Sequence, residues 1–110
     1  MSHESQVVVP QSFIDLYLPP GRLKPIAPLA EIAARYEICE DLASALTERA
    51  TMVLWQHGVT QQDVLQRLHQ GLALADSGLN QKEALWIVRR LAELLNWHDV
   101  DEPYSAPGAR

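Results

Sequence analysis

The side chains that could carry out chemistry are few in this 110-residue chain, and their spacing fits no familiar catalytic motif. Neither the phosphate-binding pattern G-x-x-x-x-G-K-[S/T] nor G-x-G-x-x-G occurs, which argues against a standard nucleotide hydrolase. The four histidines stand at positions 3, 57, 69 and 98. No two share a helical turn, as two metal ligands on one helix would. The sequence therefore predicts no metal site and no cofactor, and structural roles for His57 and His69.

Cys39 and a group of neighbouring acids are the remaining candidates for catalysis. A nucleophilic cysteine needs a nearby base and partial exposure, but Cys39 falls within a series of apolar residues, so we expect a core position. The acids fall on the side of the same segment that we expect to face solvent, where burial does not tune their pKa values; they are Glu37, Glu40 and Asp41. We therefore predict no catalytic residue and no enzyme activity.

The composition indicates a globular protein and makes some partners less favourable. Hydrophobic residues make up 47% of the chain and charged residues 21%, an ordinary globular mixture. The formal net charge of −5 disfavours binding to nucleic acid, whose phosphates it repels. No signal-peptide pattern precedes the domain, and no stretch reaches the ~18 apolar residues of a membrane span. With a single cysteine and no internal disulfide, these features predict a cytoplasmic protein without a membrane segment.

The elements that position these side chains are predicted to be α-helices. Apolar residues recur at steps of three and four from Pro28 to His57, with Gly58 as a C-terminal cap. Capping-box patterns at 60–63 and 80–83 begin two further helices, which we expect to end from Gly71 onward and near Trp97. The third helix is expected to turn one set of apolar residues inward: Ala84, Ile87, Val88, Leu91, Leu94 and Leu95. The fold class is therefore all-α, a small antiparallel bundle of three main helices, with Trp55 and Trp97 packed at helix ends.

A short helix is predicted before the bundle. Ser12 and Asp15 form a capping-box-like pair, and Pro19-Pro20-Gly21 ends the helix. We expect its apolar side chains to lie as a strap across a groove of the bundle: Phe13, Ile14, Leu16 and Tyr17. The predicted organisation is a flexible N-terminus at 1–9, a helical domain at 10–97 and a flexible acidic tail at 98–110.

Trp86 is the residue that most suggests binding. It falls outside the inward face of its helix, on the side that carries Lys82, Arg89 and Arg90. A tryptophan beside arginines is typical of the hot spots of protein interfaces. Two interpretations stay open, because the strap or the first long helix could instead cover Trp86 within the fold. The candidate partner surface is Trp86, Arg89, Arg90 and Lys82, and the function predicted from it is a non-enzymatic protein-interaction module, an adaptor or a regulatory protein.

The alternative function is a nucleic-acid-binding regulator of the helix-turn-helix type. Residues 58–68 resemble the first helix of that motif. The stretch from Gly71 to Leu79 is longer than the motif's three- or four-residue turn, and the helix after it begins with only one base. Such a regulator would use Arg67, Lys82, Arg89 and Arg90.

Four segments together resemble a family of small uncharacterised proteobacterial proteins, some of which carry the label "ATPase with chaperone activity". The segments are 10–14, 19–22, 33–41 and 86–94, and they span most of the chain. The resemblance implies a bacterial cytosolic protein that associates with a chaperone or an ATPase. It brings no catalytic motif with it, and the chain has no P-loop of its own.

Overall fold

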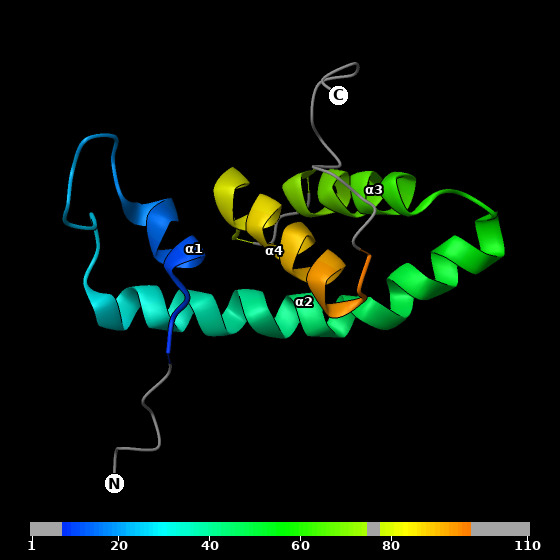
Figure 1. The fold of residues 1–110 in the computed structure, drawn as a ribbon, viewed down its shortest axis with the longest axis horizontal. Coiled ribbons are helices and arrows are strands. Elements are labelled where there is room, and N and C mark those ends of the chain that lie inside the picture. The colour runs from blue at the N-terminus through cyan, green and yellow to red at the C-terminus, as the bar shows by residue number, and fades with distance from the viewer. Residues whose placement is uncertain (1–7, 75–77, 98–110) are drawn as a thin grey trace, which may run out of the picture.

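The computed structural model describes residues 8–74 and 78–97, and the regular elements within them are all helices (Figure 1). Its elements are α1 (Gln11–Ile14), the 3-10 turn η2 (Asp15–Tyr17), α2 (Leu29–His57), α3 (Gln61–Leu74) and α4 (Gln81–Leu94). The prediction of an all-α bundle with three main helices and a short N-terminal helix is confirmed. The predicted tail at 98–110, and most of the predicted N-terminus at 1–9, lie outside the described residues. None of the described helices is long and apolar enough to cross a membrane.

The helix ends follow from local hydrogen bonding. The carbonyl of Pro28 accepts the amides of the first turn of α2, and the helix ends at Gly58, whose φ of 63° is left-handed and favours glycine. At the start of α4, the side chain of Asn80 accepts from the amide of Glu83 and the side chain of Glu83 accepts from the amide of Asn80. The predicted capping box of α4 is thus complete. Gly71, by contrast, does not end α3, which continues to Leu74.

The central helix of the bundle is α4, which packs against both α2 and α3 (Figure 1). Its predicted inward residues Ala84, Ile87, Val88 and Leu91 are fully buried. Leu94 is an exception, since 39% of it is exposed. A surface helix normally buries one apolar face. Because α4 packs against both α2 and α3, it buries residues over a wider part of its surface.

The core has two apolar clusters, one toward each end of α2. The first joins the N-terminal segment, defined here as residues 8–28, to α2 and α4, and its buried members are Phe13, Ile32, Cys39, Ala43, Trp86 and Ile87. The second joins α2 to α3 and the end of α4, and its buried members are Ala50, Val64, Leu65, Val88, Leu91 and Trp97. The core position predicted for Cys39 is therefore found, and so is that of Trp97. Trp55 was expected to pack but is 78% exposed.

Candidate functional site

The N-terminal segment supplies the centre of an aromatic cluster. The ring of Phe13 lies 5.0 Å from that of Trp86 and 5.6 Å from that of Tyr36, both edge to face, and 5.7 Å from that of Tyr17. Such edge-to-face pairs stabilise a fold beyond their buried area. Phe13 is completely buried, so the segment is a part of the core and not only a cover over it.

Trp86 is enclosed by this cluster. Only 8% of its surface is exposed, and its indole Nε1 donates a hydrogen bond of 3.0 Å to Oγ of Ser12. Of the two interpretations left open by the sequence, the structure shows the one in which the N-terminal segment covers this residue. The prediction that Trp86 presents its ring to a partner is therefore wrong, because the ring is buried against the N-terminal segment.

Arg90 is also committed to the fold. Its guanidinium donates to both carboxylate oxygens of Glu40, at 2.9 and 3.0 Å, and to Glu93 at 2.9 Å. Its hydrogen bonds to these acids, first of all to Glu40, raise the pKa of Arg90. Glu40 is half-buried and not on the solvated face that we expected, because this ion pair ties α2 to α4. The charge of Arg90 is thus offset within the chain.

A groove runs between the N-terminal segment and α4. We call it the N-terminal groove, and its volume is about 520 Å³. Its walls come from the N-terminal segment, from Tyr36 of α2 and from one side of α4, and its lining residues are Val8, Pro10, Ser12, Leu16, Tyr36, Lys82, Leu85, Trp86, Arg89, Arg90 and Glu93. All of the candidate surface residues therefore line one groove. Of the strap residues only Leu16 does so, while Phe13, Ile14 and Tyr17 pack into the first core cluster.

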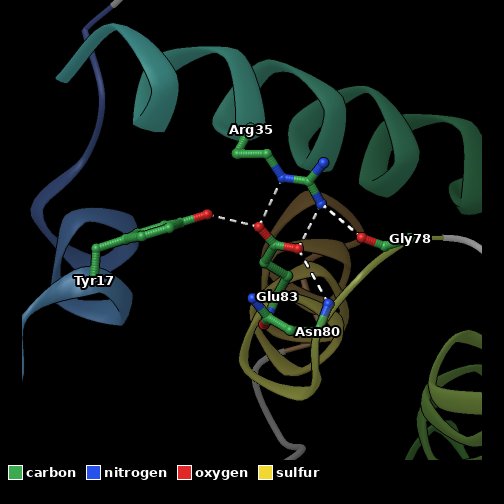
Figure 2. A network of polar contacts seen from close by, with 5 residues as sticks. All are labelled: Tyr17, Arg35, Gly78, Asn80 and Glu83. Carbon is green, nitrogen blue, oxygen red and sulfur yellow. Dashed lines mark hydrogen bonds and ion pairs between the residues drawn. The ribbon is translucent and has the colours of Figure 1, made fainter. Parts of the chain in front are cut away.

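Beside this cluster, the carboxylate of Glu83 is held in a polar network that the sequence did not predict. Figure 2 shows it between the phenol of Tyr17 and the guanidinium of Arg35. Tyr17 donates to Glu83 Oε2 at 2.6 Å, and Arg35 donates through Nε at 2.9 Å and through Nη2 at 2.6 Å. Arg35 also donates to the carbonyl of Gly78 at 3.1 Å, and the amide of Asn80 donates to Glu83 at 3.2 Å. The network joins η2, α2 and the start of α4.

The electrostatics of Glu83 follow from this arrangement. Glu83 is 1% exposed, and burial by itself would raise its pKa. The hydrogen bonds from Arg35, Tyr17 and Asn80 outweigh burial and hold the pKa of Glu83 below its usual range. Burial and the neighbouring carboxylate raise the pKa of Tyr17. A sequence signal was available, because Glu83 stands four residues before Ile87 and therefore on the inward face of the helix.

The buried ionisable groups of this region are Glu83 and Cys39. Glu83 stays ionised with its oxygens occupied by partners from three elements. Burial raises the pKa of the Cys39 thiol to about 12, so Cys39 is neither a thiolate nor accessible. Among the residues that the structure describes, no three potential metal ligands come together.

The bases named for a helix-turn-helix function lie on two helices. Arg67 pairs with Asp63 on α3, at 3.1 Å, and Lys82, Arg89 and Arg90 lie on α4. A recognition helix must expose one whole side to enter the major groove. The exposed side of α4 carries Lys82, Arg89 and Glu93 and forms a wall of the N-terminal groove, and the other sides of the helix are packed.

Comparison of the chain with protein-family models, with curated proteins and with solved structures found no match.

Proposed function

We propose that this chain is a non-enzymatic protein-interaction module, an adaptor or regulatory protein of the bacterial cytosol, and that it binds a partner protein in the N-terminal groove. The observation that carries the proposal is the make-up of this groove. Its lining combines apolar side chains, such as Leu16 and Leu85, with the bases Lys82 and Arg89 at its edge. Apolar contacts with a few polar groups are what a specific binding site requires.

Charge supports a partner with an acidic binding segment. The chain carries a net charge of −5, yet two of the exposed charged residues of α4 that line the groove are the bases Lys82 and Arg89, and the acid beside them, Glu93, pairs with Arg90 at 2.9 Å. The rest of this acidic chain repels an acidic partner, whereas the bases Lys82 and Arg89 attract it. The partner would therefore be oriented toward the groove. The setting in the bacterial cytosol, and an association with a chaperone or an ATPase, rest on the sequence resemblance.

The internal pairing of the buried ionisable groups favours binding over catalysis. A catalytic acid or base needs a pKa close to the working pH and access to a substrate. Glu83 has neither, because its pKa is depressed and its oxygens are occupied. Cys39 has neither, because it is buried as a neutral thiol.

The nucleic-acid alternative has weaker support. Its recognition helix would be α4, and α4 buries residues on several sides, including Glu83, Trp86 and Leu91. Its late base Arg90 is held by Glu40 and Glu93. The alternative is nevertheless tested by the same experiment.

The test is affinity capture from the lysate of the source organism, with and without nuclease, read by mass spectrometry. The groove variant is Lys82→Glu with Arg89→Glu, since both side chains are exposed and line the groove. The matched control is Arg22→Glu with Lys24→Glu, which makes the same charge change at exposed positions outside the groove. Trp86→Ala is unsuitable, because removing a buried tryptophan costs about 3–5 kcal/mol and would unfold much of the protein.

We expect one partner to be recovered by the wild type and by the control variant in both nuclease arms, and to be lost with the groove variant. Thermal unfolding of each variant, followed by circular dichroism, checks that the fold is kept. Recovery that disappears with nuclease would instead favour the nucleic-acid regulator. Recovery that the groove variant leaves unchanged would refute the assignment to this groove.

A further inference from the structure

A second groove lies between α2 and α3 and shares no lining residue with the N-terminal groove. We call it the α2–α3 groove, and its volume is about 390 Å³. Its lining residues are Leu46, Arg49, Val53, His57, Val64, Arg67, Leu68, Gly71 and Leu72. On α2 they follow one another at steps of three and four, and on α3 they stand at positions i, i+3, i+4, i+7 and i+8, so on each helix they share one face.

This geometry is suited to a helix. Helices pack by placing a ridge of side chains of one into a groove between side chains of another. The apolar part of the groove is half-buried and so remains accessible, and it consists of Leu46, Val53, Leu68 and Leu72. A partner helix with apolar residues at positions i, i+3, i+4 and i+7 would cover it, as α4 covers other parts of the same two helices.

The ionisable side chains that line the groove are all basic: Arg49, His57 and Arg67. All of them are exposed, although Arg67 also pairs with Asp63 at 3.1 Å. Arg49 and His57 stand eight residues apart on α2, which places them about 12 Å apart along the helix axis. In a chain with a net charge of −5, this basic edge selects a partner whose acids are spread over about two helical turns.

Gly71 leaves the groove open at its α3 edge. It lies inside α3, it is exposed, and a Cβ added to it would meet no atom within 4 Å. Its φ is not left-handed, so neither the backbone nor the packing of the fold requires glycine here. Glycine weakens the interior of a helix relative to alanine. A glycine in the groove lining leaves room for the close approach of another chain.

We infer that the α2–α3 groove binds an acidic amphipathic helix of a partner protein. Leucine-like side chains of that helix fill the apolar part, its backbone passes close to Gly71, and its acids meet Arg49, His57 and Arg67. This inference is independent of the proposed occupant of the N-terminal groove. With both grooves occupied, the chain would join two partners.

The inference is tested with the full chain and two designed peptides of eighteen residues, each labelled with fluorescein. Both carry leucines at helical spacing; one has glutamates on the flanks and the other has lysines. Fluorescence anisotropy measures their binding to the wild type and to three variants. Gly71→Gln adds a long side chain to the groove lining, Gly71→Ala is its matched control with one added methyl group, and Arg49→Glu reverses one charge.

We expect the glutamate peptide to bind at least tenfold more tightly than the lysine peptide. Gly71→Gln and Arg49→Glu should each weaken it at least tenfold, and Gly71→Ala should weaken it less. Gly71→Gln should keep or raise the melting temperature, because glutamine is the better helix former. The N-terminal groove variant, Lys82→Glu with Arg89→Glu, should bind the glutamate peptide as the wild type does.

Three results would overturn the inference. Equal affinity for the two peptides would remove the charge selection. Binding that is unchanged by Gly71→Gln would place the peptide elsewhere on the surface. Self-association in sedimentation experiments that Gly71→Gln abolishes, without peptide binding, would show that a second copy of this chain occupies the groove.

Discussion

Replacing Glu83 with glutamine would remove the charge on which the polar network depends while keeping the size of the side chain. In the wild type both carboxylate oxygens accept hydrogen bonds, from Tyr17, Arg35 and the amide of Asn80. Glutamine retains one oxygen, and its amide group is a donor that would face other donors. Arg35 would then lose its counter-charge.

The magnitude follows from burial. Removing one partner of a buried ion pair costs about 3–5 kcal/mol, because the other charge is left without compensation. The Glu83 side chain is 2% exposed, but that of Arg35 is 30% exposed, so water can reach the abandoned guanidinium. We therefore expect the low end, about 3 kcal/mol of the free energy of unfolding. For a domain of this size, that lowers the melting temperature by roughly 12–24 °C.

The assay is urea unfolding at pH 7, followed by circular dichroism and by tryptophan fluorescence. Glu40→Gln is the matched control, because it removes the same charge from a pair with arginine whose side chains are 24% and 33% exposed. A pair of that exposure contributes about 1 kcal/mol or less. If the two variants lose the same free energy, burial does not set the strength of the Glu83 network and the reasoning is refuted.

Two further predictions concern titration and accessibility. Because the folded protein holds the pKa of Glu83 below its usual value of 4.5, the stability that Glu83 contributes is fully present above that pH and is lost as the pH falls through the lower, folded pKa. The free energies of unfolding of the wild type and Glu83→Gln should therefore differ less at pH 3 than at pH 7, and a constant difference would contradict this. The Cys39 thiol is fully buried and has a pKa of about 12. At pH 8 it should therefore react with a disulfide reagent only as fast as the protein unfolds. Rapid reaction of the native protein would show instead that the thiol is accessible.

Local signals in the sequence predicted the helices well. Pro28 and Gly58 delimit α2, and the pattern Asn80 to Glu83 begins α4, because caps depend on residues three or four positions apart. The end of α3 was predicted from Gly71 onward to Gly78, and the helix continues past Gly71 to Leu74, since a helix tolerates glycine at a modest cost in stability.

The candidate site was predicted less well, because it depends on contacts between distant segments. The periodicity of apolar residues placed Trp86 and Arg90 outside the inward face of α4. That reasoning is valid only for a helix that packs on one side. The N-terminal segment and α2 add further packed sides, and they cover Trp86 with Phe13 and Ser12 and pair Arg90 with Glu40. Trp55 shows the opposite error: Val53 and Leu54 pack against the second core cluster, and Trp55 is left in solvent.

The contacts of the N-terminal segment also bear on the order in which the protein folds during synthesis. Ser12 and Trp86 are separated by 74 positions, and Tyr17 and Glu83 by 66. A ribosome makes Phe13 long before it makes α4, so the first core cluster cannot close until α4 has been made. Closing such long loops is slow compared with forming a helix. The aromatic cluster should therefore form late, and Ile32 and Cys39 of α2 stay uncovered until α4 has left the ribosome.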